Sequence, residues 1–540
     1  MKSISPPRSV CGRTHFGFSA HYIIALALAL GLVALLLYRS LNARAQNELA
    51  GMATQGSPGH KLEFVSGELL VRFRPGSALA AKGKTTGSLQ LLADGKTIPL
   101  QIERFAGSEL VEGLVLARVA PVESRAAIKV LKSRDDVLYV EPNYIRHAQA
   151  VPNDTRYADL WAMKNAPAGG AGISAEAAWD TTTGNHSVVV GVIDTGIDTG
   201  HRDLTANIFV NSAEVANNGV DDDGNGFVDD VNGWDFVSND KTVFDSASAD
   251  AHGTHVAGTI GARGNNAVGV VGVNWDVQIM PLKALGPAGG SDSNIIAAYQ
   301  YAKLMRQRGV NLRVLNNSYG GQGFSQSLRD AINELNTAGI LFVAAAGNAT
   351  TINDFVPEYP ASFELPNVIS VAASDNTGGF ASQFSNRGPQ SIHLAAPGQG
   401  ILSTTPRGYT GNGIVAAYTE SDGSTYSNFS GTSMASPHVA GAAALACAAN
   451  PNVSLQQLRA AILYSGDESG AFSSLTITGR RLNANKTVQA ALENDTTAPA
   501  TPANFRVNSQ TDRRIGLRWN EAGDDGTSLR ASLEIGRAHV

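Results

Sequence analysis

The chain of 540 residues contains only two cysteines, Cys11 and Cys447. Because Cys11 precedes an apolar leader, an exported and processed chain keeps Cys447 alone and forms no intramolecular disulfide. Charged residues make up 16% of the chain, with 41 Lys and Arg against 47 Asp and Glu. No run of basic residues is present, which argues against nucleic acid as a partner. Without disulfides, an exported protein needs another source of stability, and a bound metal is the first candidate.

The N-terminal residues 1–45 have the features of a signal peptide. Residues 1–20 carry basic but no acidic side chains, and the nearly unbroken apolar run of residues 22–38 follows. The Ala-Arg-Ala sequence at 43–45 is a small-x-small cleavage site. The apolar run is at the short limit for crossing a bilayer. We therefore expect a secreted protein. The alternative is an uncleaved anchor with the rest of the chain outside, and only then is the membrane a partner.

Two segments after the leader have the patterns of folded domains. Residues 61–147 combine strand-like alternation at 68–73 and 137–142 with helical spacing between them, which predicts a small α/β domain. In residues 151–493, continuous apolar strands alternate with helical stretches. This second pattern predicts an α/β domain whose mostly parallel sheet is flanked by helices.

The C-terminal residues 498–540 begin with a linker rich in Pro and Thr. Two alternating segments follow, at 503–507 and 515–519, and they resemble the opening of a fibronectin type III module. Such a β-sandwich needs about 100 residues. Because far fewer remain, we expect only the start of the module here and a longer natural chain.

The strongest local signal is Gly-Thr-Ser-Met-Ala-Ser-Pro-His-Val-Ala-Gly at residues 431–441. Small residues run into an alanine-rich helix and place Ser433 at its N-terminus, where backbone N–H groups favour negative charge. A serine hydroxyl is a weak nucleophile that needs a base. His252 opens another helical segment, His-Gly-Thr-His-Val-Ala-Gly, and supplies one. Taken alone, Ser433 is more simply interpreted as a helix cap, and it is the whole eleven-residue string that changes this interpretation.

Two further polar residues follow apolar strands. Asp194 ends the strand of residues 188–193, and Asn348 comes shortly after the strand of residues 340–346. Polar groups at the carboxyl edge of a parallel sheet lie where α/β proteins bind ligands. For Asp194 alone, a turn aspartate is the simpler interpretation.

Together these four motifs resemble the subtilase family of serine proteases, and the chain order Asp, His, Ser is that of subtilisin. The resemblance implies a subtilisin-like endopeptidase that hydrolyses polypeptides. In it, Ser433 is the nucleophile, His252 the base and Asp194 the group that orients the base. Asn348 then donates to the oxyanion, together with the backbone N–H of Ser433.

The resemblance also assigns a role to residues 61–147, those of an inhibitory pro-segment that the enzyme itself removes. The pro-segment is then an intramolecular partner, and maturation falls between Arg146 and Thr155. A permanent N-terminal domain is the alternative. A rival class for the whole chain is a pseudoenzyme or a calcium-dependent adhesion protein, although pseudoenzymes usually lack a member of the triad.

The family binds its substrate as an extended strand between two chain segments, and the resemblance transfers this to the present sequence. The matching positions are Gly286, Gly289, Ser318, Tyr319, Gly320, Ala346, Gly347 and Glu358. Glu358 precedes a Tyr-Pro-Ala run that resembles the family's pocket-base loop. A charged residue at this position is a departure from a neutral pocket. Its carboxylate either attracts Arg or Lys of the substrate or faces water.

Calcium is the predicted cofactor. Residues 221–230 contain five carboxylates, and their spacing matches the first half of a calcium loop. The predicted ligands in this loop are Asp221, Asp223, Asn225 and Asp229. Position twelve is Asn232 rather than Glu, so the loop is not an EF-hand, and a solvated acidic loop is the alternative. The family resemblance implies a second calcium site at Asp203 and Asn266.

Overall fold

The computed structural model describes residues 64–75, 77, 86–93, 95–145, 151–165, 170–411 and 418–493, and the backbone of 503–510 and 515–520. The chain divides into two compact units, Met1–His147 and Ala148–Val540. The predicted leader, residues 1–45, lies outside the described residues. Within the described ranges, no helix has the length and apolar character that a membrane span requires.

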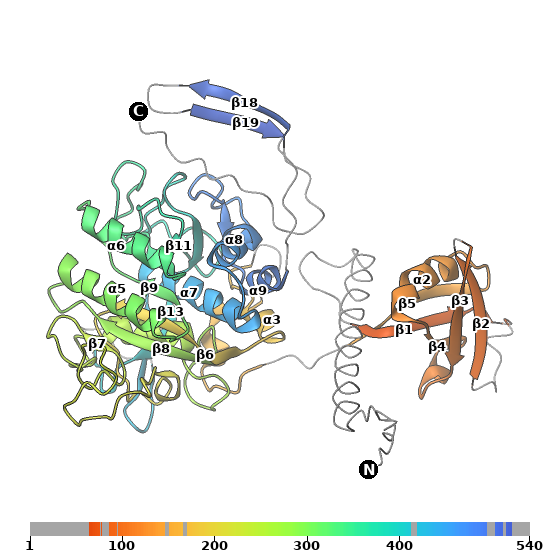
Figure 1. Cartoon of the computed structure of the whole chain (residues 1–540), viewed down its shortest axis with the longest axis horizontal. Coiled ribbons are helices and arrows are strands. Elements are labelled where there is room, and N and C mark those ends of the chain that lie inside the picture. Colours follow the sequence, from red (N-terminus) through yellow and green to blue (C-terminus); the bar gives the residue numbers. More distant parts are fainter. Residues whose placement is uncertain are drawn as a thin grey trace, which may run out of the picture. The chain divides into compact units, whose positions relative to one another are not determined.

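The first unit is an antiparallel sheet of five strands with a helix on one face (Figure 1). In spatial order the strands are β2 (Thr86–Ala93), β3 (Lys96–Glu103), β4 (Leu114–Arg118), β1 (Phe64–Phe73) and β5 (Val137–Tyr144). On β1, Leu69, Val71 and Phe73 alternate inward and are fully buried. The helix α2 (Ser124–Lys132) packs its Ile128 and other apolar residues against the same face.

The second unit is built around a sheet that is almost entirely parallel. Its described strands, in spatial order, are β16 (Asp467–Glu468), β17 (Arg480–Arg481), β12 (Leu394–Pro397), β11 (Val368–Ser374), β10 (Leu341–Ala345), β9 (Leu312–Asn317), β6 (Gly184–Asp194), β8 (Asp276–Lys283) and β7 (Trp234–Asp235). Only the short β16 is antiparallel to its neighbour. The predicted mostly parallel sheet is confirmed.

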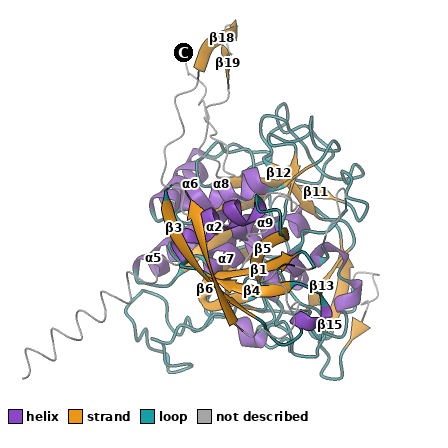
Figure 2. Ribbon diagram, turned by 90° about the vertical axis from the view of Figure 1, so that its right-hand side faces the viewer, coloured by secondary structure: helices purple, strands orange, loops and turns teal. Residues whose placement is uncertain are grey.

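Helices cover both faces of this sheet (Figures 1 and 2). One face packs against α5 (Asp292–Gln307) and α6 (Gln326–Thr337). The other packs against α3 (Ala175–Trp179), α4 (Ala251–Gly261), α7 (Thr432–Ala449), α8 (Leu455–Ser465) and α9 (Ala484–Leu492). The period of two along β6 divides its apolar run between these layers. Val188, Val190 and Val192 face α4 and α7, whereas Val189 and Ile193 face α5 and α6.

Two smaller sheets complete the described part. β13 (Ile401–Thr405), β15 (Thr425–Phe429) and β14 (Tyr418–Thr419) form an antiparallel sheet, and β13 contacts α4. Near the C-terminus, β18 (Ala503–Gln510) and β19 (Ile515–Asn520) pair as antiparallel strands (Figure 2). These two strands coincide with the alternating segments that predicted the start of a β-sandwich.

Candidate active site

Asp194 is the last residue of β6 and lies at the carboxyl edge of the sheet. Its side chain is 1% exposed, and its Oδ1 faces Nδ1 of His252 at 2.8 Å. The same oxygen accepts a hydrogen bond from the backbone N–H of Thr195 at 2.7 Å. Since an ionised carboxylate only accepts hydrogen bonds, Nδ1 of His252 carries the proton in this pair. The contact therefore leaves Nε2 of the neutral imidazole as the basic nitrogen.

His252 is the second residue of α4, and a glycine beside it lets the helix approach β6 closely. A β-carbon on Gly253 would lie 2.3 Å from the carbonyl oxygen of Gly196 and 3.1 Å from Cβ of Asp194. Any larger residue there would push α4 away from Asp194. About a third of the His252 side chain, 34%, is exposed, so the ring is partly accessible from outside.

The electrostatics of the pair favour a charged His252. Burial lowers the pKa of His252, but the charge of Asp194 and its hydrogen bond outweigh burial and raise the pKa above its ordinary value. The other histidines in the core behave differently. Burial lowers the pKa of His255 to about 3 and that of His438 to about 4. Within this group, His252 is the histidine whose pKa is raised.

Ser433 is the second residue of α7 and is half-buried. Its hydroxyl donates to the carbonyl oxygen of Ser318 at 3.2 Å, while the Ser318 hydroxyl donates to the carbonyl oxygen of Ser433 at 2.9 Å. Ser318 directly follows β9, which pairs with β6 so that Asn317 lies opposite Ile193. The start of α7 is thus tied to the strand end beside Asp194. In this rotamer Ser433 Oγ makes no hydrogen bond to His252, and catalytic hydrogen bonds are often long or poorly aligned before substrate binds.

Two hydrogen-bond donors, one from a side chain and one from the backbone, lie close together at Ser433. The Asn348 side chain follows β10, and its Oδ1 accepts from the N–H of Thr432 at 2.8 Å and from the Thr432 hydroxyl at 3.0 Å. This orientation leaves Nδ2 of Asn348 and the backbone N–H of Ser433 without an acceptor among the described residues. A β-carbon on Gly431 would lie 3.4 Å from Nδ2 of Asn348 and 3.6 Å from N of Ser433. Glycine keeps the space between the two donors open.

A buried lysine that the sequence reasoning missed supports this arrangement. Lys283 ends β8 and lies opposite Asp194 in the sheet. Its ammonium group donates to the carbonyl oxygen of Thr195 and, at 2.5 Å, to Oδ1 of Asp250, the residue before α4. Burial lowers the pKa of Lys283, but the hydrogen bond and charge of Asp250 raise it overall. Lys283 thereby joins the residue after Asp194 to the start of the His252 helix.

The two predicted substrate segments have different hydrogen bonding in the structure. Gly286 and Gly289 bond to each other within a turn, through N–H to carbonyl contacts of 3.0 and 2.9 Å. In the second segment, the Tyr319 hydroxyl lies 2.6 Å from that of Tyr299 and faces the interior. The backbone N–H groups of Ser318 and Gly320 have no acceptor among the described residues. This second segment therefore offers free donors for an added strand.

The third predicted segment begins to be accessible only at Gly347. Ala346 is fully buried, and its carbonyl oxygen accepts from the side-chain amides of Asn353 and Asn386 at 2.9 and 3.1 Å. Gly347 is half-buried and donates to the Thr432 hydroxyl at 3.1 Å. Glu358 lies beside this glycine and is also half-buried.

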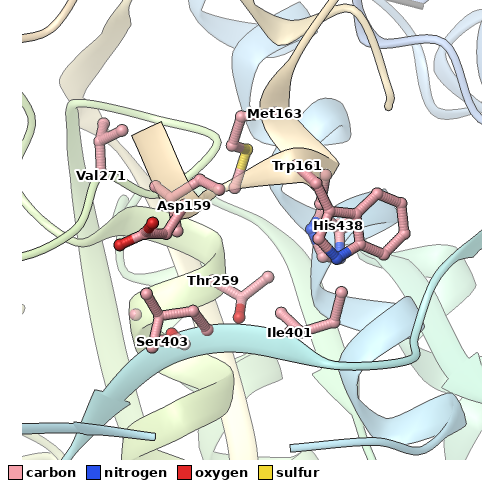
Figure 3. A pocket seen from close by; sticks show the side chains of 12 residues that line it. Asp159, Trp161, Met163, Thr259, Val271, Ile401, Ser403 and His438 are labelled. Atoms are coloured by element: carbon pink, nitrogen blue, oxygen red, sulfur yellow. The ribbon is translucent and has the colours of Figure 1, made fainter. Parts of the chain in front are cut away.

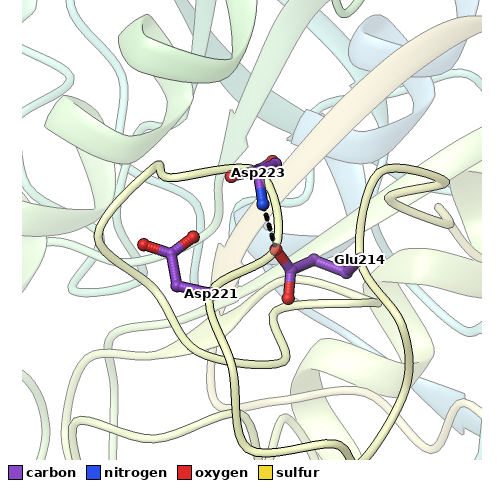
Figure 4. A group of neighbouring side chains, drawn as sticks. All are labelled: Glu214, Asp221 and Asp223. Atoms are coloured by element: carbon purple, nitrogen blue, oxygen red, sulfur yellow. Dashed lines mark hydrogen bonds between the residues drawn. The ribbon is translucent and has the colours of Figure 1, made fainter.

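The acidic loop, defined here as residues 214–230, has no helix or strand. Carboxylate oxygens of Glu214, Asp221 and Asp223 lie within 4.8 Å of one another (Figure 4). Glu214 also accepts from the N–H of Asp223 at 3.1 Å. Two of the four predicted ligands are thus brought together, with Glu214 as a third group. Glu214 lies outside the Asp-x-Asp-x-Asn-Gly spacing, so that pattern could not reveal it.

The other two predicted ligands of this loop have other contacts. The Asp229 carboxylate pairs with Lys241 at 2.8 Å and accepts from the N–H groups of Asn218 and Gly219. The Asn225 amide donates to Asp230 at 2.8 Å and to Asp223 of the carboxylate cluster at 3.3 Å. Asn225 therefore adjoins the cluster, whereas the Asp229 carboxylate is not among its three groups.

At the second predicted metal site, Asn266 Nδ2 donates to Asp203 Oδ1 at 2.7 Å. Asp203 is fully buried, and burial raises its pKa to about 8 against the opposing effect of its hydrogen bonds. Asp154, which the sequence reasoning missed, is 5% exposed in the same region. One Asp154 oxygen accepts from the N–H of Asn265, and the other is buried without a hydrogen-bond partner in the described ranges. The carboxylates of Asp154 and Asp203 and the amide of Asn266 offer oxygen ligands, which suit a hard cation.

The cavity in Figure 3 is separate from all of these groups. It is lined by Thr259, Ile401, Ser403 and His438 among others, and by residues of the segment 159–163. None of its lining residues is a predicted catalytic, substrate or metal residue. It is therefore distinct from the candidate active site.

Comparison with known proteins agrees with this geometry. The model of the subtilase family matches residues 185–495. An extracellular protease of Xanthomonas campestris pv. campestris is 36% identical over 70% of this chain, which spans 64% of that protein. An extracellular basic protease of Dichelobacter nodosus is 30% identical over 87% of this chain and 79% of its own length. A thermophilic serine proteinase of Bacillus sp. strain AK1 is 34% identical over 73% and 81%.

Among solved structures, that of proteases from Pseudoalteromonas arctica PAMC 21717 superimposes with a TM-score of 0.50 at 30% identity. The match covers 63% of this chain and 100% of that one. In this fold Asp194 ends a strand, and its partner His252 and Ser433 begin two helices that pack together. These features together define a serine peptidase. The chain belongs to the subtilase family.

Proposed function

We propose that this chain is a secreted serine endopeptidase, made as a self-processing zymogen and stabilised by calcium. The observation that carries the proposal is the 2.8 Å contact between Asp194 and His252 at the strand end adjoining the Ser433 turn. A nucleophile, a base and a group that orients the base are the parts that acyl transfer requires.

In the proposed reaction, Ser433 Oγ forms a bond to the carbonyl carbon of the substrate, and its proton passes to Nε2 of His252. The carbon–nitrogen bond then breaks, and His252 returns the proton to the leaving amine. Water attacks the acyl-enzyme in the same way and releases the acid. Asp194 holds the tautomer of His252 and stabilises the imidazolium without taking the proton.

Asn348 and the N–H of Ser433 are the proposed donors to the oxyanion. Their support is the convergence of two donors near Gly431, where no side chain fills the space. The Asn348 amide is oriented in advance, because Thr432 holds its oxygen. Donors fixed before the reaction need no reorganisation as charge develops.

Calcium is proposed at two places in the second unit. Glu214, Asp221 and Asp223 would hold one ion, and Asp154, Asp203 and Asn266 would hold another. A bound cation compensates carboxylates that are close together or buried without a cationic partner. Its role here is structural, since it binds the folded state and shifts the unfolding equilibrium.

Export and self-processing are proposed from the leader and the first unit. The names of two relatives contain the word extracellular, in keeping with export of this chain. Residues 61–147 are the proposed inhibitory pro-segment, and cleavage between Arg146 and Thr155 would release it. Mass spectrometry of the mature N-terminus tests both points, because an uncleaved anchor keeps residues 22–38.

The decisive experiment compares wild type with Ser433→Ala. We expect casein hydrolysis, self-processing and labelling by an organophosphate in wild type only. Ser430→Ala, a change of a neighbouring serine whose hydroxyl bonds to the N–H of Gly400, is the matched control. Hydrolysis by Ser433→Ala at the wild-type rate would contradict the mechanism.

A further inference from the structure

Glu358 is placed between the two segments that hold the Ser433 turn. A β-carbon on Gly320 would lie 2.8 Å from Oε1 of Glu358, and one on Gly347 would lie 3.1 Å from its Cγ. The carboxylate is therefore beside Gly320, and the stem of the side chain is beside Gly347. A larger residue at either glycine would displace Glu358.

Both glycines lie within two residues of groups that contact the start of α7. Ser318, two residues before Gly320, exchanges hydrogen bonds with Ser433. Gly347 itself donates to the Thr432 hydroxyl at 3.1 Å. The Glu358 carboxylate thus lies next to the two chain segments on which a substrate bound at Ser433 must rest.

The backbone around Glu358 is fixed. Tyr359 and Gly321 pair through two hydrogen bonds of 2.9 and 2.7 Å, which join the Glu358 loop to the segment after β9. The Tyr359 ring packs against Phe324 and Phe363. A carboxylate on such a support keeps its position, which favours a specific contact over a freely solvated side chain.

The protein itself does not use this charge. No hydrogen bond or ion pair to the Glu358 carboxylate is present in the described part of the chain, although burial raises its pKa. Two other shielded carboxylates of this unit have cationic partners, in the pairs Asp198–Arg407 and Asp250–Lys283. A half-buried acidic group without a partner is a candidate to bind a cation that arrives with a ligand.

We propose that Glu358 selects substrates with arginine or lysine as the residue whose carbonyl Ser433 attacks. This proposal rests on the proposed endopeptidase function. Gly320 and Gly347 have no side chain to separate Glu358 from the substrate segments, and the charged end of such a substrate residue would bind the Glu358 carboxylate. A charge-assisted hydrogen bond of this kind corresponds to a preference of roughly 10- to 100-fold.

The test uses mature enzyme and peptides that differ only at this residue, with Arg, Lys, Leu or Glu. In wild type we expect kcat/KM for Arg and Lys to exceed that for Leu by roughly 10- to 100-fold. Glu358→Gln should remove this advantage, so that kcat/KM for Arg and Lys falls relative to that for Leu, because the charge is lost at nearly constant size. Glu358→Lys should favour the Glu peptide. The matched control is Glu334→Gln, because Glu334 is an exposed residue of α6 that pairs with Lys303.

A binding experiment separates this proposal from the function on which it rests. The same peptides are titrated against Ser433→Ala protein, with and without Glu358→Gln, by calorimetry. If wild type cleaves no peptide, the endopeptidase function fails, while tighter binding of the Arg peptide that depends on Glu358 still supports the selectivity. An Arg to Leu ratio that Glu358→Gln leaves unchanged in both experiments overturns the proposal, as does an equal loss on all peptides.

Discussion

The candidate active site and the acidic loop of residues 214–230 are both rich in polar groups, but different forces hold them. Asp194, His252 and Ser433 are each attached to a strand or helix whose other residues are buried in the core. The acidic loop lacks regular structure, and its carboxylates bond to backbone N–H groups of the loop and also to side chains from elsewhere, including Arg308 and Tyr301. The first region is positioned by the packing of its strands and helices in the core, whereas the second is held by hydrogen bonds and ion pairs and, as proposed, by a cation.

The largest expected effect tests the positioned region. Asp194→Asn keeps the size of the side chain but presents an amide to Nδ1 of His252, which favours the wrong tautomer. We expect kcat to fall about 10⁴-fold, with a smaller change in stability. Hydrolysis of a chromogenic peptide measures the loss. Asp159→Asn, an exposed change that removes only the pair with Arg156, serves as control and should retain activity. Similar rates for both variants would argue against Asp194 as the orienting group.

A second change tests the support of that region. Lys283→Met leaves Asp250 buried without its cation, which typically costs about 3–5 kcal/mol of unfolding free energy. Denaturant unfolding of the Ser433→Ala protein measures this without self-digestion. The matched control is Lys303→Met, because Lys303 pairs with the exposed Glu334, where the loss should be about 1 kcal/mol or less. Adding Asp250→Asn to Lys283→Met should recover part of the loss, and equal effects of both lysine variants would contradict the idea.

The two regions also differ in how much of them could be predicted from the sequence. The strands and helices that hold Asp194, Asn348 and Ser433 lie where their apolar patterns predicted them, because continuous burial leaves a strong signal in the sequence. Asp154 and Glu214 were missed, since each meets its partners only after distant segments fold together. Lys283 was also missed, although a lysine at the end of a buried strand is itself an unusual feature. Local spacing likewise assigned Asp229 to the metal, whereas the structure pairs it with Lys241.

The third prediction concerns the acidic loop of residues 214–230. Removing calcium with a chelator should lower the free energy of unfolding by about 3 kcal/mol if the ion is held at 100 times its dissociation constant. Calorimetry of the Ser433→Ala protein over a range of calcium concentrations measures this. Glu214→Gln should shift the calcium dependence of the melting temperature to higher concentration, whereas Asp229→Asn should not. Equal shifts would place Asp229 among the ligands and restore the interpretation from spacing.

The smallest expected effect is a pH dependence of activity and stability that comes from His252 in the candidate active site. Because the pKa of His252 is raised, the base form predominates only above the ordinary value of about 6.5. We expect kcat/KM on an uncharged peptide to rise with pH through this pKa. Stability has the opposite sign. The charged pair with Asp194 contributes fully below the unfolded pKa of histidine, and this contribution is lost as pH rises through the folded pKa.

Nuclear magnetic resonance of the Ser433→Ala protein can follow His252 directly, because two other core histidines titrate far below it. Burial holds the pKa of His255 at about 3 and that of His438 at about 4. In Asp194→Asn the opposing charge is gone while burial remains, so the pKa of His252 should fall below its wild-type value. A pKa that stays the same would mean that Asp194 does not determine the charge of His252. A fall would tie the pH dependence of catalysis to the end of β6.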